Sequence, residues 1–505
     1  MSILIKGATV MTMAAGTGTE PFVGDLLIEG DRIREIGSVA PAQVADLVIE
    51  GRDRLVMPGL VNAHIHSWET FLKGRYDNMP LEIWMLYAYP ILGCTPLADR
   101  VIYLRSLLCG IECLKAGITT IIDDVIEMPG QNLEQIETVA KAYEELGIRA
   151  GVSGHIINIP LIDTLPYAAD ILPRELLAQA KRRRPLTAEE FLGFSREAIA
   201  RFHGRAGRLS YVLGPGGPQR CTPDLLVGAH ELAHAADVAF HLHVLETKVQ
   251  AMAGKEIYGK SLVQHLHELG VLSDRTTMAH AIWVTDADIE LMGAVAASVV
   301  HNPKSNTKLG SGIMPYRKLL DAGVNVALGS DGVASNDTPR MFDVMNLTAL
   351  MHKVTTPDRT KWPTADEVLR CATIGGARSA MLQDEIGSLE PGKKADMILL
   401  DLRTLNFTPL NDIRNQLIYC ENGSSIEQVI VNGEVVVRNG ALTKVDEADV
   451  LAELRDYLPE FRKHYAEIEA LNRVFEPYFE EMCKRCADQR IGINRYGNEP
   501  RGMVT

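Results

Sequence analysis

Long apolar runs are missing from this chain of 505 residues. No run reaches the ~18 residues that a membrane-spanning helix needs, which excludes an integral helical membrane protein. The N-terminal residues MSILIKGATV also lack the basic segment, the apolar segment and the cleavage site of a secretory signal. Only 8 cysteines are present, scattered along the chain, which indicates free thiols instead of a disulfide framework. These absences predict a cytoplasmic protein.

Positive charge is also in short supply, with 51 Lys and Arg residues against 65 Asp and Glu and a formal net charge of −14. This balance argues against a phosphate-binding surface, and therefore against nucleic acid as the main partner. The run KRRR at 181–184 is the local exception, and we interpret it as a solvated helix end before Pro185. The hydrophobic content of 46% is ordinary for a globular protein. We therefore expect a small-molecule substrate as the partner.

The length exceeds what one compact core normally fills, so we predict one large domain and a smaller one. Short strands separated by turn signals occupy residues 1–54, and a similar texture returns over residues 385–445. Asn432-Gly433 lies between two apolar runs there and predicts a hairpin. We expect both segments to form one small β-sandwich domain, and residues 446–505 to form a helical tail.

Between these ends, residues 55–384 alternate buried-type strands with helical stretches. The predicted strands lie at 55–64, 117–124, 149–156, 209–216, 238–246, 276–282, 297–305 and 325–332. Eight successive β-α units predict a (β/α)₈ TIM barrel, so the fold class is α/β. The long connection over 158–203 is expected to add helices over the mouth of the barrel.

Side chains that can bind a metal or transfer protons gather at the ends of these strands, where a (β/α)₈ barrel carries its catalytic groups. They are His64 and His66 on the first strand, His243 and Glu246 on the fifth, His280 on the sixth, His301 on the seventh and Asp331 on the eighth. Imidazole and carboxylate ligands suit a zinc-class metal, which lowers the pKa of a bound water towards ~7. Glu246 can reach such a water and pass protons to a leaving group. The pattern predicts a metal-dependent hydrolase.

Other histidine and cysteine motifs receive a structural interpretation. The HELAH motif at 230–234 matches the H-E-x-x-H pattern of zinc proteases, but its helix precedes the fifth strand and should lie on the outer ring. The HLH motif at 265–267 lies in a helical stretch. His241 alternates with His243, so it is either a layer residue inside the barrel or a partner that orients a metal ligand. The lone C-x-x-C pair at 483–486 predicts no metal or redox role.

Five motifs in order resemble the amidohydrolase superfamily, and more narrowly its branch of triazine hydrolases and nucleoside and guanine deaminases. They read PGLVNAHIH, HLHVLE, MAHAIW, HNPKSNTKLGSG and LGSDGVASND. The segment GGARSAMLQDEIGSLEPGKKADMILLDL resembles the return from barrel to small domain in the same group. The resemblance covers about residues 1–445.

This resemblance implies a single divalent metal, usually zinc, with iron or manganese as alternatives. Its ligands would be His64, His66, His243 and Asp331. Glu246 would shuttle protons between the water and the leaving group, His280 would hold or polarise the hydroxide, and Asp331 would also accept its proton. Dinuclear relatives use a carboxylated lysine at the end of the fourth strand. That strand reads LSYVLGPGGPQRCT here, without lysine, which favours one metal.

Substrate contacts are also suggested. The resemblance implies that His301 lines the substrate pocket. Trp84 in the loop after the first strand, with Trp283 after the sixth, is assigned to a flat substrate ring, although the loop aromatics could equally pack the loop. Relatives that act on adenosyl substrates usually read G-P-H where this chain has Gly-Pro-Gly at 214–216, and tend to carry an acidic residue for the ribose where Gly93 stands. These departures favour a substrate other than a nucleoside.

The leading functional prediction is hydrolytic deamination of an amino-substituted nitrogen heterocycle. A close alternative displaces chloride, alkylamine or amide nitrogen at the same site, although the pairing of Glu246 with Asp331 favours an amine that must be protonated to leave. An alternative of another class is a non-catalytic scaffold with an inherited barrel. Such a scaffold would be free to lose ligands that this chain retains.

The tail carries apolar residues at helical spacing, which need a partner surface. We expect this stripe to support a homo-oligomer, a dimer or higher, because symmetric assemblies are common among enzymes. Packing on the chain's own barrel is the alternative. Pro459 and Pro477 are expected to divide the tail into shorter helices.

Overall fold

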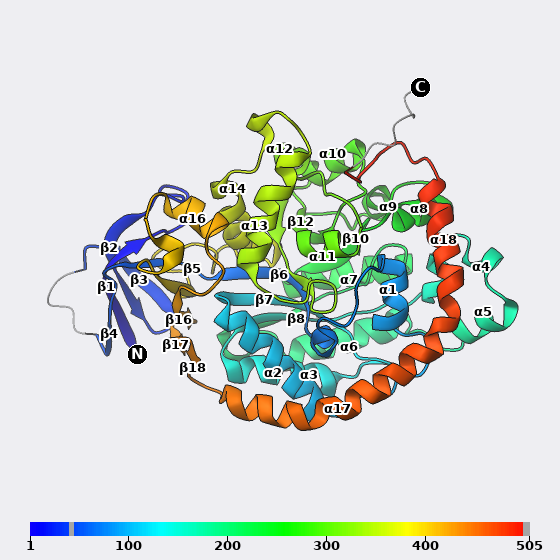
Figure 1. Cartoon of the computed structure of the whole chain (residues 1–505), viewed down its shortest axis with the longest axis horizontal. Coiled ribbons are helices and arrows are strands. Elements are labelled where there is room, and N and C mark those ends of the chain that lie inside the picture. The colour runs from blue at the N-terminus through cyan, green and yellow to red at the C-terminus, as the bar shows by residue number, and fades with distance from the viewer. Residues whose placement is uncertain (40–44, 498–505) are drawn as a thin grey trace.

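The structure is a computed structural model that describes residues 1–39 and 45–497. Residues 498–505 of the expected tail lie outside this range. Figure 1 shows a helix-wrapped body with a sheet at one side, built from both ends of the chain, and a long C-terminal helix that follows the edge of the molecule. Among the described residues, no helix combines the length and apolar character that crossing a membrane requires.

Parallel strands surround the centre of the body. They are β6 (Leu60–His66), β7 (Ile118–Val125), β8 (Arg149–Gly154), β9 (Leu209–Val212), β10 (Phe240–Val244), β11 (Thr276–His280), β12 (Ser298–His301), β13 (Asn325–Leu328) and β14 (Asp331–Gly332). The strands pair in the orders β14-β6-β7-β8-β9 and β10-β11-β12-β13, and a bridge from Leu213 to Phe240 joins the two sets. Because β14 directly follows β13 in the chain and pairs with β6, the ring of parallel strands closes.

Every residue of β6 and β7 is buried, as expected for barrel strands covered on both faces. The outer helices are α2 (Asp99–Lys115), α3 (Leu133–Leu146), α6 (Ala188–Phe202), α7 (Pro223–Ala236), α8 (Lys248–Tyr258), α9 (Leu262–Glu268), α10 (Asp286–Ala294), α12 (Tyr316–Asp321), α13 (Met341–Met351), α14 (Ala365–Arg370) and α15 (Gly376–Ser379). The connection over 158–203 contains α4 (Ala168–Ile171), α5 (Arg174–Ala180) and α6, so it does add helices.

The segment predicted as the first barrel strand, 55–64, is two strands. Arg54–Pro58 forms β5, which pairs with the end sheet, and the barrel strand β6 begins at Leu60. Gly59 lies between the two strands. Only glycine fits there, because a Cβ atom would lie 2.1 Å from the side chain of Thr119. The sheet at the chain ends therefore includes residues up to Pro58.

Both chain ends contribute to one mixed sheet of nine strands, in the order β18-β17-β16-β15-β5-β1-β2-β3 with β4 beside β1. Apart from β5, the strands are β1 (Ser2–Val10), β2 (Phe22–Glu29), β3 (Arg32–Gly37), β4 (Leu47–Glu50), β15 (Met397–Asp401), β16 (Ile426–Val431), β17 (Glu434–Arg438) and β18 (Ala441–Leu442). The two chain ends do form one structure, as expected: β5 pairs with β1 on one side and β15 on the other, which makes the pairing continuous. The hairpin at Asn432-Gly433 is confirmed, with φ of 53° and 74° between β16 and β17.

The tail packs on this chain's own barrel mouth. Helices α17 (Glu447–Asn472) and α18 (Glu476–Asp488) run along the edge of the molecule and then turn up its side (Figure 1). Phe461, Phe475 and Phe479 are buried in one apolar cluster with Leu72, just after β6, and with Trp84 in helix α1 (Leu81–Ala88). The apolar residues of the tail therefore pack on the barrel of the same chain, which was the alternative expectation. A homo-oligomer stays a prediction.

Proline divides the tail only once. Pro459 lies inside α17, contrary to expectation, whereas Pro477 falls in the first turn of α18, where proline is tolerated. Leu454 and Phe461 on either side of Pro459 are both buried. We attribute the continuity of α17 to this packing, which offsets the lost backbone hydrogen bond.

Phe475 provides a test of this packing. Its side chain is fully buried, so Phe475→Ala is expected to destabilise the fold by about 3–5 kcal/mol. The adjacent Val474 is 46% exposed, and Val474→Ala should change stability by less than about 0.5 kcal/mol. Thermal unfolding of both variants measures the difference. Equal melting temperatures for the two would contradict the packing of the tail.

Candidate metal-dependent active site

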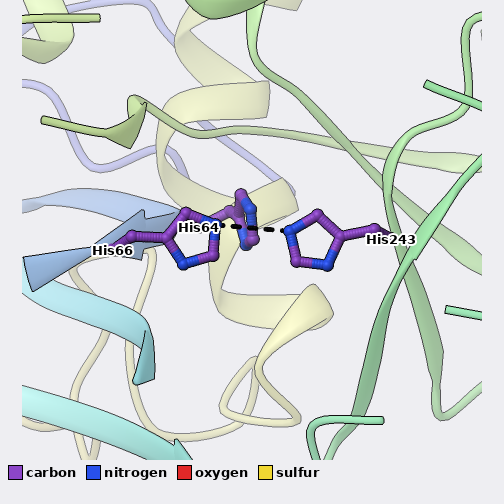
Figure 2. Close-up of side chains that lie close together, drawn as sticks. All are labelled: His64, His66 and His243. Atoms are coloured by element: carbon purple, nitrogen blue, oxygen red, sulfur yellow. Dashed lines mark hydrogen bonds between the residues drawn. The ribbon is translucent and has the colours of Figure 1, made fainter. Parts of the chain in front are cut away.

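Strand ends from opposite sides of the barrel bring four metal-competent side chains together. His64 and His66 end β6, His243 comes from β10 and Asp331 from β14, and all four are buried. Figure 2 shows the rings of the three histidines converging on one point. The Nε2 atoms of His64 and His66 each lie 3.4 Å from Asp331 Oδ1, and Nε2 of His243 lies 3.3 Å from Nε2 of His66.

These spacings fit one zinc-class ion. A tetrahedral site with metal–ligand bonds of about 2.0–2.1 Å has edges of about 3.3–3.4 Å between ligand atoms. Within the described chain, Nε2 of His64 is buried and has no hydrogen-bond partner, an arrangement that is costly unless something else binds the atom. The donors are imidazoles and a carboxylate, which zinc prefers. The residues therefore fit a metal that would be held by His64, His66, His243 and Asp331.

Hydrogen bonds on the far side of each ring aim the ligand atoms inwards. Nδ1 of His64 lies 2.8 Å from Nε2 of His241, and Nδ1 of His66 donates to the Asp124 carbonyl oxygen at 2.8 Å. Both contacts leave Nε2 directed at the metal position, the usual role of partners behind metal-binding histidines. Of the two interpretations of His241, the structure therefore supports the partner that orients a ligand.

Glu246 and His280 face the same centre. Nδ1 of His280 is 2.9 Å from Asn306 Oδ1, which directs Nε2 towards Glu246 Oε2 at 3.7 Å and Asp331 Oδ2 at 3.8 Å. Both His280 and Asp331 have positive φ, 74° and 64°. Such backbone strain clusters at functional sites, where the surrounding structure holds it in place. Nε2 therefore lies between two carboxylates, in position to hydrogen-bond a small molecule there.

The two carboxylates have opposite proton affinities. Burial raises the pKa of Glu246 to about 7, and the charge of Asp331 adds to that rise. Burial acts in the same direction on Asp331, but His280, His64 and His66 outweigh it and hold its pKa well below the usual value. One carboxyl group is thus suited to carry a proton near neutral pH, and the other to stay ionised.

Sequence analysis missed Glu69, a third carboxyl group in the pocket of 30 Å³ that lies against this centre. Glu69 lies in the 3₁₀ helix η1 (Ser67–Leu72), where its Oε2 accepts a hydrogen bond from the Ala334 amide at 3.0 Å. Its Oε1 is buried without a hydrogen-bond partner among the described residues, and burial raises its pKa to about 8. The rule of strand ends could not select a helical residue.

Asp124 and His155 were also missed, although both stand at the end of a predicted strand. Oδ2 of Asp124 lies 2.7 Å from Nδ1 of His155 and 3.9 Å from Nδ1 of His243. The signal for both residues is the one that identifies His64 and Asp331: a polar side chain at the end of a predicted strand.

The three proposed substrate contacts have different outcomes. Trp84 lines the pocket beside the metal cluster, whereas His301 and Trp283 do not. His301 points out of the barrel and lies 3.0 Å, Nε2 to Nε2, from His352, because the adjacent Val300 takes the inward position in this strand. The indole of Trp283 donates to the Ser311 carbonyl oxygen at 2.8 Å. Neither His301 nor Trp283 lines this pocket, so their contact with the substrate stays a prediction that the geometry does not support.

The HELAH motif lies on α7, in the outer ring. Nε2 of His230 is 2.9 Å from the hydroxyl of Ser273, and His234 is exposed. We expect the double variant His230→Ala, His234→Ala to keep its metal content, because neither ring faces the barrel interior. Elemental analysis of the purified variant measures this. Loss of the metal would restore the protease interpretation.

Comparison with known proteins agrees with this geometry. Residues 55–436 match the model of the amidohydrolase family. The chain is 36% identical over 448 residues to a 5-methylthioadenosine/S-adenosylhomocysteine deaminase of Caldanaerobacter subterraneus subsp. tengcongensis, covering 88% of this chain and 95% of that protein.

Solved structures show the same similarity. A zinc-bound adenosine deaminase from Xanthomonas campestris superposes with a TM-score of 0.80 at 27% identity, covering 91% of this chain and 98% of the other. The zinc complex of the atrazine chlorohydrolase TrzN from Arthrobacter aurescens TC1 gives a TM-score of 0.80 at 26% identity, covering 90% and 100%. The family match spans the barrel and every residue of the metal cluster, so this chain belongs to the amidohydrolase family.

Proposed function

We propose that this protein is a metal-dependent aminohydrolase that releases ammonia from an adenosine-like nitrogen heterocycle. The observation that carries the proposal is the grouping of Glu246, His280 and Asp331 around four converging ligand atoms. A relative with the name of a deaminase shares 36% identity over nearly its whole length. A scaffold without catalysis has no need for three residues that can position and move protons.

The chain's own residues supply the steps of the reaction. A bound zinc-class ion would lower the pKa of a water molecule and so provide a nucleophile near neutral pH. Asp331, ionised before the reaction, accepts a proton as the water oxygen forms a bond to the ring carbon, and this proton later returns to Glu246. Glu246, with a pKa of about 7, delivers a proton to the amino nitrogen. The carbon–nitrogen bond then breaks, and the nitrogen leaves as ammonia.

His280 is assigned a positioning and polarising role. Its ring is fixed through Asn306, so that Nε2 stays near both carboxylates throughout the reaction. A group held in this way stabilises developing charge without reorganisation, which is the main source of electrostatic catalysis.

The proposal of an adenosine-like substrate replaces the earlier expectation of a substrate other than a nucleoside. It rested partly on Gly93, which stands where relatives carry an acidic residue. Gly93 has a φ of 83° and lies against α17, where a Cβ atom would be 2.9 Å from the side chain of Leu471. The positive φ disfavours any side chain at this position, and the tip of Leu471 would have to move aside for one. The absence of an acid at residue 93 is therefore explained by the backbone conformation and does not argue against a sugar.

Release of ammonia and release of chloride distinguish the two candidate reactions. Chloride displacement is kept as an alternative because the zinc complex of a chlorohydrolase has the same fold. Zinc-loaded protein should be assayed with adenosine, 5′-deoxyadenosine, adenine and a chlorotriazine. We expect ammonia from at least one adenine compound and no chloride. Chloride release alone, or no product from the panel, would overturn the proposal.

A further inference from the structure

The structure contains a cavity of 270 Å³ beside the metal pocket, and the two share Met85 and Tyr89 in their walls. Isoleucine side chains from the segments after β7 and β8 form much of the larger cavity. Glu127 also lines it, but its carboxylate is already paired with Arg105. A substrate whose reacting carbon lies at the metal centre would place its remaining part in this space.

Two polar atoms in the walls of this cavity lack a hydrogen-bond partner among the described residues. They are Nε2 of His155 and Oε1 of Gln131, and both are buried. The Gln131 side chain is held by its other end, where Nε2 donates to the His155 carbonyl oxygen at 3.0 Å. Because buried polar atoms in folded proteins are nearly always hydrogen-bonded, these two atoms point to a bound partner.

The chemistry of this partner follows from the contacts of His155. Its Nδ1 lies 2.7 Å from Oδ2 of Asp124, and a carboxylate only accepts, so Nδ1 carries the hydrogen. Nε2 is then the remaining hydrogen-bonding atom of the ring, and Oε1 of Gln131 is an acceptor. Apart from Arg183 and Arg184 on one side, the wall beside them is largely apolar. A hydroxyl can both donate and accept a hydrogen bond, so a hydroxylated group matches both atoms.

A second metal site explains the cluster less well. Asp124, His155 and His243 have ligand atoms within 4.8 Å of one another. However, 2.7 Å between Asp124 and His155 is a hydrogen-bond length, shorter than the edge of about 3.3 Å between two ligands of one tetrahedral ion. Asp124 therefore serves as the anchor of His155.

Gly216 makes room for this arrangement. A Cβ atom at residue 216 would lie 2.7 Å from Nε2 of His155 and 2.8 Å from the carbonyl oxygen of Ile156. The glycine in the Gly-Pro-Gly segment at 214–216 is thus required by close approach. It keeps a side chain from displacing the His155 ring, which stays in the wall of the cavity.

We propose that His155, with Gln131, binds a hydroxylated, sugar-like substituent of the substrate. The inference rests on the proposed function, since it assumes that the heterocycle occupies the metal pocket. His155 then determines specificity: it holds the part of the substrate that does not react.

His155→Asn is the sharpest variant, because the asparagine amide can replace Nδ1 in the contact with Asp124 while Nε2 is lost. Binding is measured by calorimetry on zinc-loaded protein with Glu246→Gln, so that the ligand is not consumed. The probes are adenosine and 9-methyladenine, which lacks the sugar. We expect His155→Asn to weaken adenosine about 10- to 100-fold, as for a lost buried hydrogen bond, and to change 9-methyladenine less than about 3-fold.

Two further variants separate binding from folding. Gln131→Leu should also weaken adenosine selectively, and His265→Asn, a buried histidine on the outer helix α9, should change neither affinity. Equal weakening of both probes by His155→Asn, or no weakening, would overturn the inference. A second zinc ion that is present in the Glu246→Gln protein and lost on adding His155→Asn would also overturn it. If the Glu246→Gln protein binds adenosine and 9-methyladenine equally, only this inference is wrong. If it binds neither probe, the proposed function is wrong as well.

Discussion

Glu246→Gln is expected to lower turnover by about 10²- to 10⁴-fold while the protein keeps its metal. The substitution preserves the size of the side chain and the position of its oxygen. It removes the only proton that Glu246 can transfer, and Glu246 does not belong to the four-residue ligand set. Steady-state kinetics with the best adenine substrate, together with elemental analysis, measures both effects.

The control for Glu246→Gln is Glu268→Gln, on α9, where the carboxylate pairs with Lys260 at the surface. This variant should keep both turnover and metal. If Glu246→Gln retained near wild-type turnover with bound metal, the proton-transfer role would be wrong. If it lost the metal, Glu246 would have to be counted among the ligands.

Substitution of Asp331 should have a different signature, with turnover and metal lost together. Asp331→Asn is preferred over alanine, because asparagine tolerates the positive φ of 64° at this position. Replacing even the outer partners of metal ligands typically weakens binding ~10–100-fold, so we expect a loss above that range for a ligand itself. Elemental analysis and a zinc titration of the chelated protein provide the measurement.

Wild-type protein in the same titration should take up one ion per chain, since the fourth strand supplies no lysine to bridge two. Asp286→Asn, at an exposed site on α10, should behave like the wild type. Tight binding of zinc by Asp331→Asn would remove Asp331 from the ligand set. Two tightly held ions in the active wild-type protein would contradict the single-metal prediction.

The metal cluster was predictable from the chain because it depends on a local rule. In a ring of parallel strands all C-terminal ends meet at one rim, so a ligand is found wherever a suitable side chain ends a strand. His64, His66, His243 and Asp331 follow this rule, and the structure brings them together. Asp124 and His155 obey it as well, since both lie at the C-terminal ends of barrel strands.

The direction of a side chain at a strand end is harder to predict. His301 ends β12 just as His280 ends β11, yet His301 points outwards and contacts His352. A shift of one residue in register moves a side chain to the other face of the strand. In a strand that is apolar on both faces, the sequence does not show which residue faces the interior.

Distant contacts decided the rest. The sheet at the chain ends is continuous because β5 pairs with β15, more than 300 positions further on, and no local pattern shows whether two β-rich segments share one sheet or stack as two. Pro459 continues α17 although proline normally ends helices, because the flanking residues are held by tertiary packing. The sequence likewise does not show that Gly93 has a positive φ and lies against α17, which explains why glycine stands there.

By itself, the sequence predicted the parallel barrel and the grouping of His64, His66, His243 and Asp331, because strand periodicity and residue chemistry are local properties. Only the tertiary structure decided that the tail covers the helix carrying Trp84, and that Asp124 anchors His155 in the wall of the larger cavity. These outcomes depend on which surfaces meet, and packing between residues far apart in the chain leaves no periodic trace in the sequence.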